Sequence, residues 1–540
     1  MRKSETADSS VDVIIVGAGF AGMYMLYYLR KKGLKAGILE AGDDVGGTWY
    51  WNRYPGARCD VESMAYSYSF DEELQQEWNW SNRFSYQPEI LDYLKTVADR
   101  FDLNRDIFLK SRVLSAEYEE DVNIWRVRTD AGIEYSAKFF VMATGCLSVP
   151  KNPKIDGLER FEGETFYTWN WSKEKVDLTG KKVGVIGTGS SGVQCIPVIA
   201  TDASHLTVFQ RTPNFSVPAF NRTLEKYEAD TVKKAYKQLR EKARNSIAGD
   251  FPDEGTITLG ELPINLQRQH LEESWKKGGF NMQYPFTDLL TDAKVNEVVA
   301  EFVREKIRSI VRDPKTAEAL SPRNHPFGTK RMCVEDDYYQ TFNRENVSLI
   351  DLSSSPIEEI VSLGVKTTTK LHRLDILVLA TGFDAMTGAL TAVDIRGRGG
   401  VALRDKWKNG ARTFLGMTIA EFPNLFTVTG PGSPSVLCNM VSAIEQSVEW
   451  IGDCIKYVEE KGYGGIEARR SAENKWTAHV SDAADQTLYP LANSWYVGAN
   501  ISDKARGFMP YVNGLKVYEE ACQRESDADY QNFTLTRKIQ

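Results

Sequence analysis

Two glycine-rich segments carry the clearest chemical signal in this sequence. Residues 17–22 read GAGFAG and residues 187–192 read GTGSSG, and each follows a short run rich in β-branched residues. A buried strand followed by GxGxxG is typical of a dinucleotide site, because the glycines permit a tight turn, close approach of a pyrophosphate and close packing of the next helix. A flexible glycine loop is the ordinary alternative for either copy. We predict two dinucleotide sites, built on Gly17, Gly19 and Gly22 and on Gly187, Gly189 and Gly192.

The residues at the end of the next strand of each unit distinguish the two nucleotides. After the first motif, a predicted strand over residues 35–40 ends in Glu40, whose carboxylate suits the ribose hydroxyls of an adenosine and repels a 2′-phosphate. After the second motif, residues 206–210 lead into Arg211 and Thr212, and a cation there suits the extra phosphate of NADP. We therefore predict FAD at the first site and NADPH at the second. A surface ion pair is the alternative role for Arg211.

The overall composition narrows the class of protein. The 540 residues include 66 Lys and Arg against 74 Asp and Glu, a net charge of −8 that argues against a general nucleic-acid partner. Residues 13–29 carry no charge, but three glycines interrupt them, so we expect a strand, a turn and a helix through residues 23–29 rather than a membrane span. The seven cysteines are scattered and HExxH is absent, so we expect neither disulfides nor a metal site, and a cytoplasmic protein.

These signals predict an α/β fold with two Rossmann-like dinucleotide-binding domains and a helical insertion. Residues 139–145 and 376–382 are apolar strands that each end in Ala-Thr-Gly, while residues 220–325 show helical spacing of apolar positions between dense charges. The stretch from residue 383 is rich in Gly, Pro and Trp, and we expect it to fold back onto the first unit. The predicted boundaries are 1–145 and 383–540 for the FAD-binding domain, 146–219 and 329–382 for the NADP-binding domain, and 220–328 for the insertion.

A longer motif identifies a family. Residues 46–60, GGTWYWNRYPGARCD, match GGxWxxxx(Y/F)PGxxxD at every defined position, and this pattern resembles the type I Baeyer-Villiger monooxygenases. With both glycine motifs the resemblance covers nearly the whole chain, and residues 430–446 look more like the phenylacetone monooxygenase branch than the cyclohexanone monooxygenases. The match implies that Thr48 and Trp49 belong to the FAD site.

One family fingerprint departs from its pattern. In FxGxxxHxxxWP, Phe161, Gly163 and Trp171 are kept, but Tyr167 replaces His and Ser172 replaces Pro. A phenol does not become a cation at pH 7. In the family this His belongs to the linker that relays cofactor binding, so the change concerns the coupling of NADPH use to oxygenation.

The resemblance also implies the roles of residues distant in sequence. Lys330 would reach the 2′-phosphate and its neighbour Arg331 would face the flavin, since adjacent side chains of an extended segment point to opposite faces. Asp60 would position Arg331, and Trp495 would line the nicotinamide and substrate pocket, near Leu437 and Met440. Taken singly, a surface Lys-Arg pair, a turn-capping Asp and a core Trp are the ordinary alternatives.

The activity implied by the resemblance is oxidation of a ketone to an ester or lactone with NADPH and O₂, through a C4a-peroxyflavin held as an anion by Arg331. We expect a monomer whose partners are small molecules. An N- or S-oxygenating flavin monooxygenase shares both nucleotide units and stays open, as does a non-catalytic NADPH-sensing flavoprotein. A flavin disulfide reductase is disfavoured, because this sequence contains no close pair of cysteines.

Overall fold

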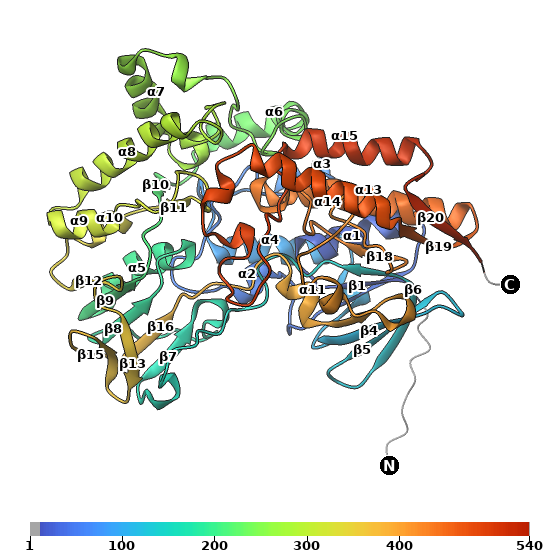
Figure 1. Cartoon of the computed structure of the whole chain (residues 1–540), viewed down its shortest axis with the longest axis horizontal. Coiled ribbons are helices and arrows are strands. Elements are labelled where there is room, and N and C mark those ends of the chain that lie inside the picture. Colours follow the sequence, from blue (N-terminus) through green and yellow to red (C-terminus); the bar gives the residue numbers. More distant parts are fainter. Residues whose placement is uncertain (1–10, 539–540) are drawn as a thin grey trace.

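Residues 11–538 are described by the computed structural model, in which two β-sheets lie side by side under a layer of helices (Figure 1). The larger sheet has the strand order β17-β4-β5-β6-β1-β2-β3, with β18 beside β6. The central strand β1 pairs in parallel with β2 and β6. The strands are β1 (Val11–Val16), β2 (Ala36–Leu39), β3 (Ile107–Phe108), β4 (Val113–Glu119), β5 (Ile124–Thr129), β6 (Glu134–Met142), β17 (Asp394–Arg396) and β18 (Leu425–Thr427).

The first glycine motif forms the turn between β1 and helix α1 (Phe20–Lys31). Gly17 has a φ of +103°, and a Cβ there would lie 2.8 Å from the carbonyl oxygen of Ala143. At Gly22 a Cβ would lie 1.8 Å from the carbonyl oxygen of Gly17, so only glycine lets the helix approach the strand. The helix begins three residues earlier than predicted, because Gly19 is already its N-cap.

The second sheet contains five parallel strands in the order β12-β9-β8-β16-β7. These are β7 (Glu164–Tyr167), β8 (Lys182–Ile186), β9 (His205–Gln210), β12 (Val347–Asp351) and β16 (Ile376–Leu379). Helix α5 (Ser190–Asp202) follows β8 directly. The predicted strand–turn–helix order of both units is confirmed, and the chain forms the predicted α/β fold.

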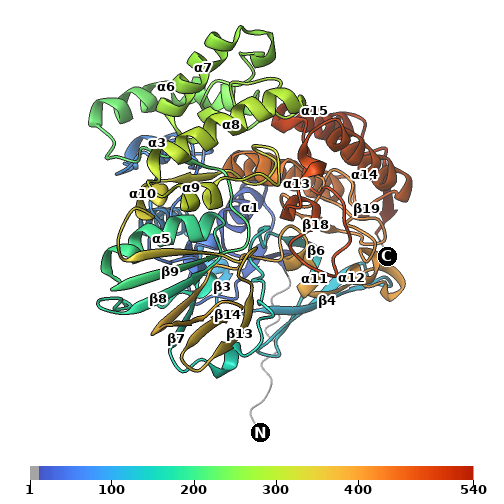
Figure 2. The ribbon, with the colours of Figure 1, turned by 60° about the vertical axis from the view of Figure 1, so that its left-hand side comes forward.

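Helices occupy most of the predicted insertion. They are α6 (Lys226–Arg244), α7 (Ile264–Lys277), α8 (Ala293–Ile310) and α9 (Pro314–Leu320). In both views α6, α7 and α8 lie at one end of the molecule, on the side away from β4 (Figure 2). The short strands β10 (Ser216–Pro218) and β11 (Cys333–Glu335) flank the insertion and pair in parallel, so the chain leaves and returns at one point.

The C-terminal stretch contributes strands and helices that contact the first unit. Strands β17 and β18 join the larger sheet, and helix α13 (Met440–Glu460) packs on α1. Two tyrosines of α1 donate hydrogen bonds of 3.0 Å to acids of α13, Tyr24 to Glu449 and Tyr28 to Asp453. Helices α14 (Arg470–Asp485) and α15 (Gly514–Asp527) and the antiparallel pair β19 (Tyr463–Ala468) and β20 (Phe533–Arg537) complete this region.

Smaller elements connect these layers. They are the helices α2 (Thr48–Trp51), α3 (Glu72–Glu77), α4 (Gln87–Arg100), α10 (Tyr338–Thr341), α11 (Gly388–Ala392) and α12 (Leu403–Lys406), and the strands β13 (Ile357–Val361), β14 (Gly364–Thr367) and β15 (Leu371–Arg373). Across residues 11–538, no helix has both the length and the apolar character needed to cross a bilayer.

Candidate active site

The first glycine turn is braced by the carboxylate that the sequence singled out. Glu40 is 5% exposed and accepts hydrogen bonds of 2.7 Å from the backbone N–H groups of Ala18 and Gly42. Burial raises the pKa of Glu40, while the two N–H donors act in the opposite direction. The acid therefore fixes the glycine turn.

A second glycine segment completes this cradle. A Cβ on Gly47 would lie 2.8 Å from the Cα of Gly19, so the two backbones touch without a side chain between them. Thr48, the next residue, is exposed at the start of α2. Bare backbone N–H groups beside the N-terminus of α1 fit the pyrophosphate of FAD.

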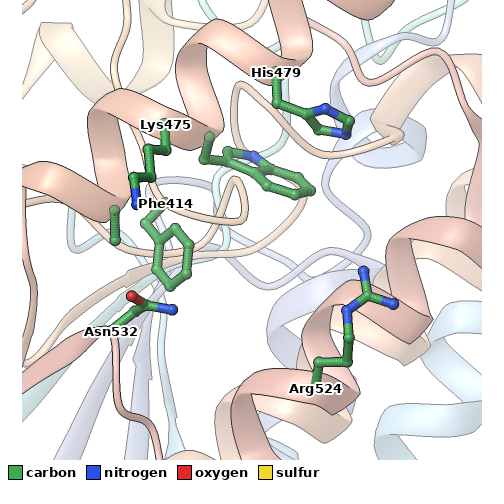
Figure 3. A pocket seen from close by; sticks show the side chains of 7 residues that line it. Phe414, Lys475, His479, Arg524 and Asn532 are labelled. Atoms are coloured by element: carbon green, nitrogen blue, oxygen red, sulfur yellow. The ribbon is translucent and has the colours of Figure 1, made fainter.

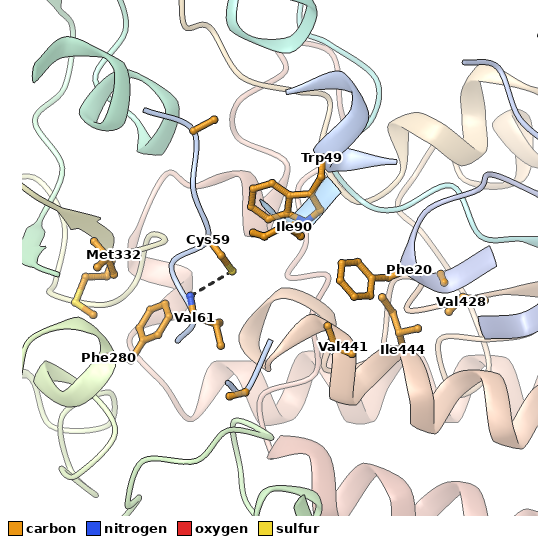
Figure 4. Close-up of a cluster of buried hydrophobic side chains, with 14 of the residues drawn as sticks. Phe20, Trp49, Cys59, Val61, Ile90, Phe280, Met332, Val428, Val441 and Ile444 are labelled. Atoms are coloured by element: carbon orange, nitrogen blue, oxygen red, sulfur yellow. Dashed lines mark hydrogen bonds between the residues drawn. The ribbon is translucent and has the colours of Figure 1, made fainter. Parts of the chain in front are cut away.

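Trp49 is almost fully buried. It is 7% exposed and donates a hydrogen bond of 3.3 Å to the phenol oxygen of Tyr66. Its indole packs in the main apolar cluster, near Phe20 and Ile90 (Figure 4). The structure thus places Trp49 in the core beneath the glycine cradle.

The second glycine turn is open where the first is closed. A Cβ on Gly192 would lie 2.2 Å from the carbonyl oxygen of Gly187, but a Cβ on Gly189 would meet nothing within 4 Å. The first turn of α5 holds no acidic residue. The hydroxyl of Thr188 donates to the carbonyl oxygen of Thr212 at 3.1 Å and so joins this turn to the end of β9. A free helix N-terminus fits a dinucleotide pyrophosphate.

Three basic side chains lie near this turn. Burial, followed by the positive charge of Arg211, lowers the pKa of both Lys330 and Lys151. None of the three forms a salt bridge to an acid within residues 11–538. Adjacent cations without acids are unfavourable unless an anion joins them, so this cluster fits the 2′-phosphate of NADP.

Lys151 was not identified from the sequence. Its backbone N–H donates to the carbonyl oxygen of Gly382 at 2.9 Å, and its carbonyl oxygen accepts from the hydroxyl of Thr381 at 3.2 Å. It therefore lies where the chain crosses between the units, beside the second Ala-Thr-Gly segment. The sequence signal that could have identified Lys151 is a basic residue shortly after the first Ala-Thr-Gly segment, where the chain passes to the second unit.

Arg331 and Asp60 form a two-point ion pair between segments that are far apart in sequence. The Nε and Nη2 atoms of Arg331 donate to the two carboxylate oxygens of Asp60 at 2.9 and 2.7 Å, and Nη1 donates to the carbonyl oxygen of Val436 at 2.8 Å. Burial alone would lower the pKa of Arg331, but the charge and hydrogen bonds of Asp60 outweigh it, so the pKa is raised well above its usual value. The guanidinium is permanently charged.

Apolar and aromatic side chains surround this ion pair. Cys59, Val61 and Met332, the chain neighbours of Asp60 and Arg331, lie in the main apolar cluster with Phe280 (Figure 4). The Arg331 guanidinium carbon lies 4.6 Å from the centroid of the Phe280 ring. Phe280 comes from the insertion and was missed, since nothing local in its sequence indicates a contact with a distant arginine. The side chains of Arg331 and Asp60 are 24% and 23% exposed, and their apolar neighbours reduce the screening of the cation by water.

Lys330 and Arg331 face different surroundings, although they are neighbours. Burial and then the charge of Arg211 lower the pKa of Lys330, whereas Asp60 and Tyr496 raise the pKa of Arg331. Asn214, two residues after Thr212, donates from Nδ2 to the carbonyl oxygen of Arg331 at 3.0 Å. The end of β9 therefore holds the backbone of Arg331, while Asp60 holds its side chain.

The three predicted pocket residues lie in one apolar cluster. Trp495, Leu437 and Met440 are partly buried there against Val436 and Tyr496. The ring centroids of Trp495 and Tyr496 are 4.4 Å apart. Because the carbonyl oxygen of Val436 accepts from Arg331, this cluster adjoins the cation.

Tyr167, the replacement for the fingerprint His, ends β7. It lies opposite Leu379 in the sheet, and its ring centroid is 5.5 Å from that of Trp169. In the part of the chain that the structure describes, its hydroxyl has no hydrogen-bond partner. Tyr167 thus lies on the edge strand of the second sheet, where its backbone pairs with β16 and its ring contacts Trp169.

A separate hollow of about 330 Å³ lies between α14 and α15 (Figure 3). Phe414, Trp476, Lys475, His479 and Arg524 are among its lining residues. It contains none of the predicted site residues. Among residues 11–538, no group of His, Cys, Asp and Glu side chains is arranged to hold a metal ion.

Comparisons with known proteins agree with this geometry. The family model described as pyridine nucleotide-disulphide oxidoreductase matches residues 14–249. All seven cysteines of the chain are free and buried, so the match reflects the nucleotide unit and not a disulfide centre.

Similar full-length proteins are oxygenases. Phenazine N-monooxygenase PhzNO1 from Lysobacter antibioticus is 42% identical over 97% of both chains. A Baeyer-Villiger monooxygenase from Pseudooceanicola batsensis is 39% identical over 99% of this chain and 98% of its own. A solved structure of oxidized steroid monooxygenase bound to NADP has a TM-score of 0.94 and 47% identity, and covers 98% of this chain and 100% of its own.

Proposed function

This chain belongs to the Baeyer-Villiger monooxygenases, and from that premise we propose that it oxidises ketones to esters or lactones with NADPH and O₂. The observation that carries the proposal is the Asp60–Arg331 pair, which joins the first unit, the return from the insertion and the apolar cluster of Trp495. A permanent cation in an apolar setting is what a negatively charged oxygen donor needs.

The two cradles accommodate the required cofactors. The glycine contacts around Gly17, Gly19 and Gly47 fit FAD, and Arg211, Thr212, Lys330 and Lys151 fit the phosphate end of NADPH. When bound, these groups supply hydride transfer and the activation of O₂. The protein contributes position, charge and exclusion of water.

Arg331 contributes a fixed charge and two free donors. Three of its five N–H groups are committed to Asp60 and Val436, which leaves two for an anionic oxygen or a carbonyl. A preorganised donor of this kind contributes about 3 to 4 kcal/mol to the stabilisation of developing negative charge. Because its pKa is raised, Arg331 stabilises the anion without protonating it.

The pocket side chains exclude water and supply no nucleophile. Trp495, Leu437 and Met440 present mainly apolar surface. Burial raises the pKa of Cys146 to about 11 and that of Tyr496 to about 12, so both groups are neutral at pH 7. An apolar ketone therefore meets the Arg331–Asp60 ion pair and no ionised thiol or phenol from Cys146 or Tyr496.

We further propose a cytoplasmic monomer with the domain boundaries given above. The net charge of −8 and the free cysteines support a protein that acts on small molecules in a reducing compartment. The two sheets support the division, since residues 11–142 and 394–427 supply one and residues 164–210 and 347–379 supply the other.

N-oxygenation is the second candidate, favoured by the 42% identity to a phenazine N-monooxygenase. With FAD bound, the site could supply an oxygen atom either to a ketone or to a heteroatom. Supplying a cyclic ketone and a phenazine together separates the two candidates. The proposed function predicts that the ketone is consumed first, and exclusive formation of the N-oxide would overturn it.

The first experiment asks whether the purified protein is an enzyme. NADPH should bleach the yellow flavin under nitrogen, and oxygen should then give an ester from a panel of ketones analysed by gas chromatography. A protein that binds NADPH without bleaching would be a nucleotide sensor instead.

A further inference from the structure

Gln194 connects the nucleotide helix of the second unit to the loop of the first unit that carries Asp60. It lies on α5, four residues after Ser190, and therefore one turn from the N-terminus beside the second glycine motif. Its side chain is half-buried and points out of its own unit. Every hydrogen bond of its amide reaches the loop of residues 54–58.

The contacts of this amide are specific. Its Oε1 atom accepts from the hydroxyl of Tyr54 at 2.8 Å and from the backbone N–H of Arg58 at 3.4 Å, and its Nε2 atom donates to the carbonyl oxygen of Arg58 at 3.1 Å. The loop also approaches the helix backbone, because a Cβ on Gly56 would lie 2.4 Å from the carbonyl oxygen of Gln194. The amide thus fixes both the distance and the direction of the loop.

The same loop continues directly into the ion pair. Asp60 follows Arg58 by two residues and holds Arg331 through two hydrogen bonds. Arg58 pairs with Asp336 and donates to the carbonyl oxygen of Val334 at 3.2 Å, on the strand that follows Arg331. A displacement of α5 would therefore move the carboxylate that orients the cation.

We propose that Gln194 is a positioning residue that couples occupancy of the NADP site to the Asp60–Arg331 pair. An anion bound at the N-terminus of α5 fixes the helix, and the Gln194 amide passes that constraint to the loop and so to Asp60. This inference rests on the proposed function for the identity of the nucleotide. It gives this chain a polar side-chain link between the two units.

A thermodynamic cycle tests the coupling without any turnover. The dissociation constant of NADP⁺ is measured by calorimetry on the oxidised, FAD-loaded parent, on Gln194→Ala, on Asp60→Asn and on the double variant. Coupling between sites is reciprocal, so each single change should weaken NADP⁺ about fivefold, at the low end of typical coupling energies. The double variant should be no weaker than the weaker single variant.

Two additional variants make the result specific. Gln194→Glu keeps the two accepted bonds but places a carboxylate oxygen against the carbonyl oxygen of Arg58, so it should weaken NADP⁺ at least as much as Gln194→Ala. Thr201→Ala should match the parent, because this α5 position is exposed and, among residues 11–538, its hydroxyl bonds only to Val198 and Asp202. If Gln194→Ala does not fold, Tyr54→Phe removes one of the three bonds and takes its place in the cycle.

Multiplied effects in the double variant, or a Gln194→Ala constant equal to that of the parent, would overturn the inference. Ketone oxidation is measured separately on the parent. A parent that oxidises no ketone would refute the proposed function and leave the NADP⁺ cycle readable.

Discussion

The two nucleotide units share a fold but differ in how far the protein itself satisfies the groups that line them. The first turn is closed by Glu40, which binds two backbone N–H groups, and by contact between Gly19 and Gly47. The second turn is open at Gly189 and faces Arg211, Lys330 and Lys151, which form no salt bridges within the described residues. We therefore expect the first unit to retain its ligand and the second to bind and release one.

The largest expected effects come from matched glycine substitutions. Gly22→Ala and Gly192→Ala each place a Cβ within 2.2 Å of a carbonyl oxygen, so each turn must shift. If the shift costs about 3 kcal/mol of binding free energy, the affinity of each turn for its own nucleotide falls on the order of a hundredfold. We expect Gly22→Ala to be isolated without yellow colour and Gly192→Ala to stay yellow but resist reduction by NADPH. Absorbance spectra before and after NADPH check both, and loss of FAD from both variants would remove the distinction between the units.

Removal of a phosphate-binding cation should affect NADPH alone. Arg211→Ala loses a charged hydrogen bond of about 1.5 to 3 kcal/mol, so the KM for NADPH should rise at least tenfold while the KM for NADH stays unchanged. The equivalent position in the first unit is Glu40, which is unchanged in Arg211→Ala, so the FAD content of this variant should equal that of the parent. Steady-state kinetics with both nucleotides measures the ratio. An equal rise for NADH would show that Arg211 acts on the fold and not on the phosphate.

The pH dependence of the two sites should also differ. The pKa of Lys330 lies below its usual value because of burial and Arg211, so the folded protein loses this proton before the unfolded chain does. Without nucleotide, the charged form of Lys330 destabilises the folded protein, so the free energy of unfolding should increase as the pH rises toward 10.5 and Lys330 loses its proton. Over the same pH range NADP⁺ should bind more weakly, because its phosphate loses a cation. FAD retention should stay constant. Calorimetric titrations from pH 7 to pH 10 check this, with Lys330→Met as the control that should keep only the part of the dependence due to Lys151.

The smallest predicted effect concerns the crossover between the units. Tyr167→His introduces a group that ionises near neutral pH at the end of β7. The ratio of ester to hydrogen peroxide should change about twofold, the size of one weak hydrogen bond. Measuring peroxide and ester against NADPH consumed tests it, and an unaltered ratio would show that the replacement is neutral.

Local sequence predicted the parts of the molecule whose geometry is local. The turns at Gly17 and Gly187 follow from strand, glycines and helix in immediate succession, and Glu40 follows from its place at the end of the next strand. The Asp60–Arg331 pair joins residues 271 positions apart, and only the family motif predicted it. Periodicity and spacing carry no information on such a contact.

The residues that were missed share one property. Phe280, Lys151 and Gln194 act on groups held by other segments: the guanidinium of Arg331, the charge of Arg211 and the loop before Asp60. Each is ordinary in its own stretch of sequence, since an aromatic, a lysine and a helical glutamine are common. Their roles arise only when the sheets bring the segments together.

The central claim is that the charge of Arg331, oriented by Asp60, directs activated oxygen into a ketone. The most direct measurement is the amount of ester formed per NADPH consumed by the FAD-loaded parent and by Arg331→Ala. We predict that the parent forms close to one ester for each NADPH consumed. Arg331→Ala should still bind FAD and consume NADPH, but its ester yield per NADPH should be lower on the order of a hundredfold. Ester formed by Arg331→Ala at the yield of the parent would contradict the account.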